Sequence, residues 1–235
     1  MFYDWSAFWR ATAAGIFTYS TIHHILARFI SRKDARHHWK RINIATSFIH
    51  SILASISSIY VFIENPAMCT TDIISSFTPN AYSYISFELG YFIFDSIDNL
   101  RNPSGRHTYE ILLHHITIIG CFGISLYLGR YIGYCVISLF IEMNSIFLHL
   151  RQLFLLFNKS KYDRIYRINN IINLSTFVVF RFGVVIFMFI WLIMNRSNVP
   201  LILSFIGHSG LAIMTIINCY LLYRLLKSDF SVKNE

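Results

Sequence analysis

The chain has 235 residues, of which 55% are hydrophobic, 17% are aromatic and only 14% are charged. Soluble domains carry roughly 25% charged residues, so this composition excludes an ordinary soluble domain and predicts a polytopic membrane protein. The net charge of +8 does not indicate a nucleic-acid partner, because the Lys and Arg residues lie between hydrophobic segments and not in a patch with interleaved aromatic residues.

Seven segments have the length of roughly 20 residues and the apolar character that a bilayer-spanning helix needs. In chain order they are Trp5–Leu26, Trp39–Ile63, Ala81–Ile97, Tyr109–Leu128, Tyr131–Phe157, Ile171–Met194 and Pro200–Leu226. The first and third are shorter or interrupted by polar residues, and a cleaved signal peptide is the alternative to a retained first helix. Residues 158–170 are amphipathic and predict either an interfacial piece or a helix extension. The predicted fold class is all-α.

Positive charge in the connections predicts the orientation of these helices. Sixteen of the twenty Lys and Arg residues lie on the side where the first segment ends and the second begins. Only Arg10, Arg130 and Arg196 lie on the opposite side, while Arg181 is inside the sixth segment. The positive-inside rule therefore places the N-terminus outside and the C-terminus in the cytosol.

Polar residues recur at helical spacing within the segments, so each helix concerned carries a polar stripe. Because lipid does not tolerate such stripes, we expect these helices to enclose a polar chamber. The stripe residues are Asn43, Ser47, His50 and Ser57 in the second segment, Glu88, Tyr91, Asp95 and Asp98 in the third, Glu142, Ser145 and His149 in the fifth, Asn170, Asn173 and Arg181 in the sixth, and His208, Thr215 and Asn218 in the seventh.

Two adjacent histidines, His114 and His115, lie in the otherwise apolar fourth segment. Successive helical positions point about 100° apart, so one ring can face the chamber while the other reaches a neighbouring helix. A neutral imidazole suits the role of general base for an alcohol or amine that attacks a thioester, with Asp95 or Glu142 as the orienting carboxylate. A zinc or iron site is the competing interpretation, but the segment lacks the HxxxH or ExxH spacing of metal ligands.

Five further residues on these polar faces are candidates for binding substrate: Arg181, Tyr91, Ser145, His50 and His208. The single histidines are more often packing residues that bond a neighbouring carbonyl group. Arg181 has two interpretations, since it can hold an anionic head group or neutralise a carboxylate in a structural ion pair. The candidate carboxylates are Glu142, Asp95 and Glu88.

Several pieces of sequence, taken in their order and spacing, resemble the TRAM/LAG1/CLN8 (TLC) domain family. They are Gly90-Tyr91-Phe92-Ile93-Phe94-Asp95, the pair His114-His115, Glu142-Met143-Asn144-Ser145-Ile146-Phe147-Leu148 with Arg151, and Phe180-Arg181-Phe182. The resemblance runs from about Trp39 to Leu226 and is greatest to a subgroup, TLC domain-containing proteins 1 and 2. It implies a six-helix barrel made by the second to seventh helices, with the first helix as an additional span. The chain then divides into that first helix with a basic cytosolic linker (1–35), a TLC domain (36–229) and a cytosolic tail (230–235).

The resemblance also implies a role in setting the fatty-acid composition of membrane phospholipids, and hence membrane fluidity, at the plasma membrane. The ceramide synthases of this family transfer an acyl chain from acyl-CoA to a sphingoid amine and use a histidine pair followed by carboxylates. This chain departs from that pattern, because residues 116–141 contain no Asp or Glu and the first carboxylate downstream is Glu142. Ceramide-synthase-like N-acyl transfer is therefore the weaker alternative.

The leading hypothesis is a membrane lipid homeostasis protein that takes a phospholipid or fatty-acyl substrate into its chamber, as an acyltransferase or as a lipid-binding protein. A non-catalytic lipid sensor or channel regulator is the alternative class. No cofactor or metal is expected, and acyl-CoA is a candidate substrate whose anionic part would meet the basic stretches 28–41 and 159–167. The plasma membrane is the expected location and the endoplasmic reticulum the alternative; protein partners are not predicted.

Overall fold

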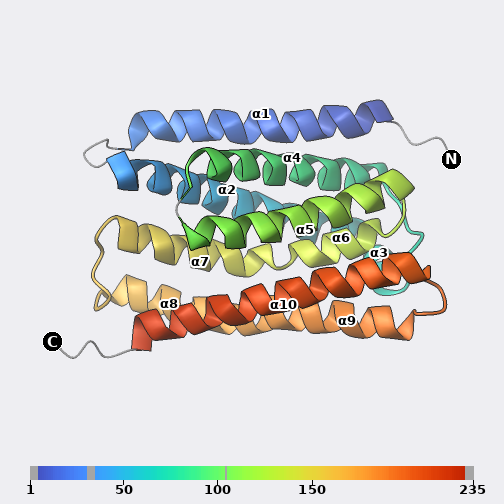
Figure 1. Ribbon diagram of the computed structural model, residues 1–235. Helices are drawn as coiled ribbons and strands as arrows, with labels where there is room; N and C mark the ends of the chain where they lie inside the picture. The colour runs from blue at the N-terminus through green and yellow to red at the C-terminus, as the bar shows by residue number, and fades with distance from the viewer. Residues whose placement is uncertain (1–4, 31–34, 104, 231–235) are drawn as a thin grey trace.

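The computed structural model describes residues 5–30, 35–103 and 105–230, and the secondary structure within those ranges is entirely helical (Figure 1). This confirms the predicted all-α fold class. The helices in chain order are α1 (Trp5–Phe29), α2 (Ala35–Glu64), α3 (Pro66–Thr70), α4 (Pro79–Arg101), α5 (Arg106–Leu128), α6 (Ile132–Leu139), α7 (Glu142–Leu156), α8 (Arg164–Thr176), the π-helix η1 (Phe177–Gly183), α9 (Val184–Met194) and α10 (Leu201–Phe230).

Apart from the short helix α3, these elements form rods that run back and forth along one axis, and they follow the seven predicted segments (Figure 1). Helices α6 and α7 make one rod, and α8, η1 and α9 make another, so α8 extends the sixth segment. Five stretches are long and apolar enough to cross a membrane: His37–Glu64, Thr108–Leu128, Ile132–Leu156, Arg164–Met194 and Leu201–Asp229. The chain is thus a polytopic membrane protein. Helices α1 and α4, the first and third predicted segments, fall outside these five, and α4 buries Glu88 and Asp95 inside the bundle.

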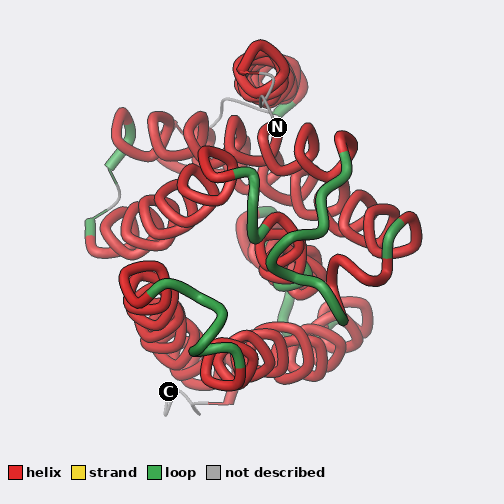
Figure 2. The backbone as a smooth tube through the Cα atoms, turned by 90° about the vertical axis from the view of Figure 1, so that its right-hand side faces the viewer, coloured by secondary structure: helices red, strands yellow, loops and turns green. Residues whose placement is uncertain are grey.

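Six rods surround a central space, and α1 lies outside them (Figure 2). Around the ring, α2 contacts α4, α4 contacts α5, α5 contacts α10, and α10 contacts the rod of α8, η1 and α9, which returns through α7 to α2. Helix α6 contacts α2, α4, α5 and α9, and thereby fills the ring at one end. The arrangement agrees with the six-helix barrel and additional first helix expected from the family resemblance.

Helix α1 packs against α4 at a place where both helices have glycine. A Cβ added to Gly15 would lie 2.2 Å from the carbonyl oxygen of Phe87, and one added to Gly90 would lie 2.3 Å from the carbonyl oxygen of Thr12. Only residues without a side chain permit this approach. The hydroxyl of Thr12 also donates to the carbonyl oxygen of Ser86 at 3.1 Å. Close packing here lets α1 support the wall of the chamber from behind.

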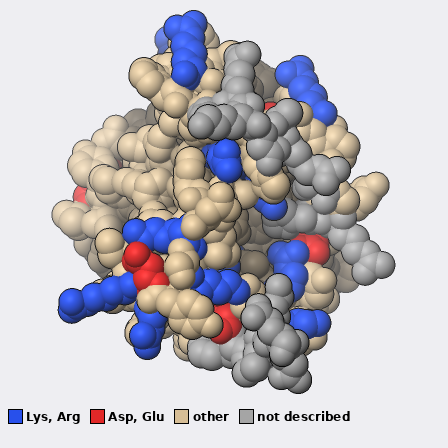
Figure 3. Space-filling model, turned by 90° about the vertical axis from the view of Figure 1, so that its left-hand side faces the viewer, with Lys and Arg blue, Asp and Glu red and all other residues tan. Residues whose placement is uncertain are grey.

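Positive charge gathers at the end of the bundle where α1, α4, α7 and α10 end and where α2 and α8 begin (Figure 3). We call this the basic end. The opposite end has Arg130 and Arg196 near the starts of α6 and α10, and the apolar core of α4, α5, α6 and α9. The segregation of charge that the sequence predicted is therefore a property of the folded bundle.

Candidate functional site

A polar cavity of about 140 Å³ lies in the middle of the ring, and an apolar cavity of about 80 Å³ adjoins it. Both cavities are lined by Phe92, His114 and Glu142. A vestibule of about 440 Å³ at the basic end shares Lys40 and Arg224 with the polar cavity. The three spaces therefore follow one another from the charged end into the apolar interior.

Eight of the nine predicted site residues line the polar cavity. They are His50, Tyr91, Asp95, His114, His115, Glu142, Ser145 and Arg181. The exception is His208, which is not among the residues that line either cavity. Its Nδ1 lies 2.7 Å from the carbonyl oxygen of Ser204 on its own helix, and its ring packs against Phe189. His208 lies at the level of Gly207 and Leu211, which line the apolar cavity, but its ring contacts Phe189 of α9, so the structure does not bring it together with the other eight residues.

His115 and Asp95 face each other across the contact between α5 and α4. His115 Nδ1 lies 3.5 Å from Asp95 Oδ2 and 3.4 Å from Ser96 Oγ. The side chain of Asp95 also accepts hydrogen bonds from Asn43 at 2.8 Å and from Asn99 at 2.9 Å. Of the two predicted orienting carboxylates, Asp95 is thus the one beside a histidine of the pair.

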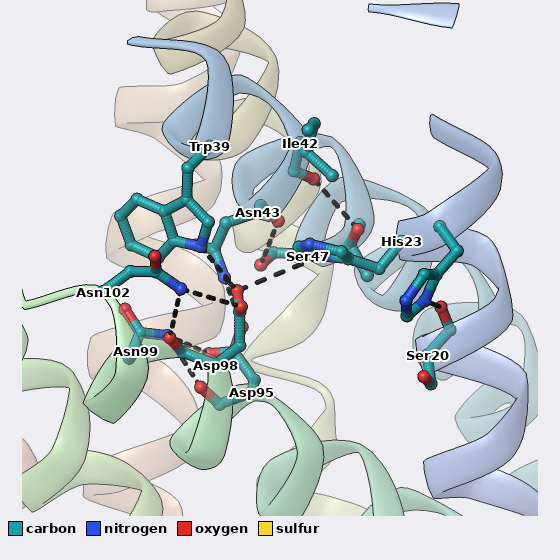
Figure 4. A network of polar contacts seen from close by, with 12 residues as sticks. Ser20, His23, Trp39, Ile42, Asn43, Ser47, Asp95, Asp98, Asn99 and Asn102 are labelled. Atoms are coloured by element: carbon teal, nitrogen blue, oxygen red, sulfur yellow. Dashed lines mark hydrogen bonds and ion pairs between the residues drawn. The ribbon is translucent and has the colours of Figure 1, made fainter. Parts of the chain in front are cut away.

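A network toward the basic end holds Asp95 in place (Figure 4). The amide nitrogen of Asn43 donates to Asp95 and also, at 2.9 Å, to Asp98 one helical turn further along α4. The indole nitrogen of Trp39 donates to the same oxygen of Asp98 at 3.0 Å, and His23 Nδ1 of α1 lies 4.0 Å from it. One amide group therefore ties two carboxylates of α4 to α2, a link that the sequence did not reveal.

His114 has a different environment from its neighbour. Its Nδ1 lies 3.1 Å from the sulfur of Met214 on α10, and the residue lines both the polar and the apolar cavity. The rings of His114 and His115 are inclined by 51° with centroids 5.4 Å apart. As predicted from helix geometry, the two adjacent histidines serve different neighbours, and His114 marks the boundary between the two cavities.

His50 lies between two carboxylates on the wall formed by α2, α4 and α7. Its Nε2 is 2.6 Å from Glu88 Oε2, and its Nδ1 is 3.9 Å from Glu142 Oε2, which also accepts a hydrogen bond from Ser51 at 2.8 Å. The imidazole stacks on Tyr91 with ring centroids 3.4 Å apart. Glu88 was not predicted as a site residue, although its i, i+7 spacing from Asp95 placed it on the same stripe.

Arg181 lies on the opposite wall, within the π-helix η1. Its Nε donates to Asn144 Oδ1 at 2.7 Å, Nη1 to Asn218 Oδ1 at 3.0 Å and Nη2 to Ser145 Oγ at 2.9 Å. Across the described ranges, no Asp or Glu oxygen lies within 4.0 Å of this guanidinium. Arg181 therefore makes no direct ion pair with a described carboxylate, and Glu142 acts on it only over a longer distance. Single-turn π-helices frequently occur at functional sites, which agrees with an arginine placed here.

The vestibule is lined by basic residues from three helices: Lys40, Arg151 and Arg224. Arg151 binds the end of α10, where its Nε donates to Asp229 at 2.9 Å. Arg224 forms an ion pair with Glu110 at 3.0 Å. Of the two stretches expected to form the basic rim, 28–41 contributes Lys40, whereas no residue of 159–167 lines the vestibule. In the described part of the chain, no three His, Cys, Asp or Glu side chains are grouped as metal ligands.

The family model of the TLC domain, TRAM_LAG1_CLN8, matches residues 41–227. The chain belongs to the TLC domain family. It is therefore a member of a membrane protein family linked to lipid metabolism. The recognised TLC domain covers all six rods of the ring and leaves α1 outside its limits.

Curated members of the TLC family cover most of the chain. TLC domain-containing protein 2 of Danio rerio is 44% identical over 83% of this chain and 78% of its own length. TLC domain-containing protein 2 of Mus musculus is 31% identical over 95% of this chain and 72% of its own length. TLC domain-containing protein 1 of Mus musculus is 26% identical over 94% of this chain and 90% of its own length. No solved structure matches the chain significantly.

Proposed function

We propose that this TLC protein takes a phospholipid or fatty-acyl substrate into its chamber and thereby regulates the fatty-acid composition of membrane phospholipids, and so membrane fluidity. The observation that carries the proposal is the order of the spaces: a basic vestibule, a polar cavity that holds the pair His114-His115, and an apolar cavity beyond His114. A lipid with a polar head and an acyl chain has the same order of chemical groups.

Acyl transfer is the mechanism that this geometry supports best. If Asp95 accepts the Nδ1 proton of His115, Nε2 becomes the basic atom of the ring. Nε2 then removes the proton from a lysophospholipid hydroxyl, whose oxygen forms a bond to the thioester carbonyl carbon of acyl-CoA. The C–S bond breaks, and the imidazolium returns the proton to the departing sulfur. His114, at the boundary of the cavities, is placed to contact the acyl carbonyl group.

The proposal also gives the protein an orientation and a location. The basic end faces the cytosol, because positive connections remain on that side of the membrane. The N-terminus is then outside and the C-terminus cytosolic, and the vestibule receives acyl-CoA from the side where it is made. We place the protein in the plasma membrane, with the endoplasmic reticulum as the alternative.

Lipid sensing without catalysis is the second candidate function. The separation of 3.5 Å between His115 Nδ1 and Asp95 Oδ2 favours it, because this exceeds the usual length of a charge-assisted hydrogen bond. The carboxylate of Asp95 also already accepts hydrogen bonds from two asparagines. Ceramide-like N-acyl transfer has no comparable support.

The test of the proposed function fills the apolar cavity. Gly210 lines this cavity, and a Cβ added there meets only Thr117 and Cys121 at 3.4 and 3.5 Å, so we expect Gly210→Leu to fold and to occupy the space of the acyl chain. Gly120→Leu is the matched control, because nothing lies within 4 Å of a Cβ at Gly120 and that position is exposed.

Phospholipid acyl composition is measured by lipidomics in cells that lack the protein and are then supplied with each variant at equal abundance. We expect wild type and Gly120→Leu to restore the same composition, and Gly210→Leu to leave it as in the cells without protein. If the Gly210→Leu variant is shown to be folded, with its leucine side chain inside the apolar cavity, and still restores the wild-type composition, the chamber does not work by holding an acyl chain.

A further inference from the structure

The wall of the chamber formed by η1, α7 and α10 carries a positive charge that only neutral groups contact. Arg181 is 7% exposed, and three of its hydrogen bonds go to the oxygens of Asn144, Asn218 and Ser145. A guanidinium group has five N–H donors, so these partners leave two donors. Removing such a charge from water is costly unless an anion compensates it, above all at membrane depth.

The carboxylates of the chamber have their own partners. Asp95 accepts from two asparagines, Glu88 is bonded to His50, and Glu142 accepts from Ser51. Glu88 and Asp95 lie on α4, whereas Glu142 lies on α7, the helix whose Ser145 contacts the guanidinium, but its carboxylate makes no ion pair with Arg181 within 4.0 Å. An anion that enters meets its attractive partner at Arg181.

Asn218 ties the guanidinium of Arg181 to α10. Its oxygen accepts from Arg181, while its Nδ2 is buried and has no hydrogen-bond partner within the described ranges. A buried donor without a partner is destabilising unless a ligand or water accepts from it. Arg181 lines the polar cavity, so its two remaining donors suit the oxygens of a carboxylate or phosphate, whereas Asn218 is among the lining residues of neither cavity.

The surroundings of Arg181 define what the anion is attached to. The apolar cavity adjoins the polar one at His114 and Glu142, and it is lined by Phe122, Leu211 and other apolar side chains. At the mouth, Lys40 adds a positive charge that attracts anions, while Arg224 is paired with Glu110. A small inorganic anion would leave the apolar cavity unused, whereas a single-chain lipid fills both.

We infer that the chamber binds a single-chain anionic lipid, with the anionic group on Arg181 and the acyl chain in the apolar cavity. The inference rests on the proposed function in taking the ligand to be a lipid. It adds that the head group is anionic and that it lies beside Arg181, inside the bundle. A fatty-acid carboxylate and the phosphate of a lysophosphatidate share this chemistry. Asn144 and Ser145 are positioning residues that hold the guanidinium.

The decisive variant is Asn218→Asp, which has nearly the same shape and places a carboxylate 3.0 Å from Arg181. Such an internal anion competes with the ligand, so we expect binding of the anionic lipid to weaken about 10- to 100-fold, the worth of one or two ionic hydrogen bonds. Thermal unfolding of the ligand-free variant should not fall below wild type. Asn198→Asp, in the exposed connection before α10, is the matched control.

Binding is measured in detergent with three probes that carry the same chain: oleate, oleoyl lysophosphatidate and uncharged monooleoylglycerol. We expect wild type and Asn198→Asp to prefer at least one anionic probe over monooleoylglycerol, and Asn218→Asp and Arg181→Gln to lose that preference. The anionic probe that binds more tightly identifies the source of the anion.

Equal binding of all three probes to wild type would overturn the inference without any variant. An unchanged preference for anions in folded Asn218→Asp would overturn it as well. These results are separate from the lipidomic test, because the chamber can fail to select anions and still alter phospholipid acyl composition, or the reverse.

Discussion

Replacing His115 by alanine is expected to slow transfer of a labelled acyl chain from acyl-CoA to lysophospholipid by about 10²–10⁴-fold, the usual contribution of a general base. His115 is the histidine of the pair beside Asp95, and it lines the polar cavity. The rate is measured with purified protein in lipid nanodiscs. His208→Ala is the control, since His208 bonds its own helix outside the cavity, and it should transfer label like wild type.

The double variant His114→Ala, His115→Ala separates catalysis from sensing. Equal incorporation of label by wild type and by the double variant would show that the histidine pair does not catalyse acyl transfer. If the double variant nevertheless restores phospholipid composition in cells, the chamber acts as a lipid sensor. Loss of both effects in a folded double variant is what the acyl-transfer mechanism predicts.

Replacing Glu88 by alanine is expected to lower the free energy of unfolding by about 1–3 kcal/mol, because it breaks a buried hydrogen-bonded contact and leaves the imidazole of His50 without its partner. Glu88 and His50 are each 1% exposed, and their side chains approach to 2.6 Å. Glu64 makes a contact of the same length with Asn80, but it is exposed. Glu64→Ala should therefore change stability by only about 0–1 kcal/mol.

The measurement is unfolding in mixed detergent micelles, followed by the loss of helical circular dichroism. The double variant Glu88→Leu, His50→Leu removes both polar groups, so it should recover part of the stability that Glu88→Ala loses. Equal losses for the substitutions at Glu88 and Glu64 would mean that the Glu88–His50 pair does not stabilise the chamber wall.

Helical periodicity was enough to predict which faces of the helices enclose the chamber. Apolar length defined the rods, and polar stripes placed eight of the nine candidate residues around one cavity. His208 is the exception, although its neighbours Gly207 and Leu211 line the apolar cavity, because spacing along the chain does not say how a helix is turned toward its neighbours. Asn218 lies ten residues further on, roughly 15 Å along an α-helix, and it is the residue of that stripe that contacts Arg181.

Contacts between helices could not be derived from the sequence. The partners His50 and Glu88 are 38 residues apart, and Asn43 and Asp95 are 52 apart, so only the packing of α2 on α4 brings them together. The π-helix that carries Arg181 also left no signal in the sequence pattern, although it changes the helical register that periodicity assumes. Candidate residues were therefore predictable, whereas their pairing was not.

The most direct test of whether the chamber holds an acyl chain uses a lysophospholipid with a photoreactive diazirine at the end of its acyl chain. After irradiation in nanodiscs, peptide mapping should find the label on residues that line the apolar cavity, such as Phe122, Leu211 and Met214, and Gly210→Leu should abolish it. Label found only on outward-facing residues such as Phe205 and Ile216, and unchanged in Gly210→Leu, would contradict an acyl chain inside the chamber.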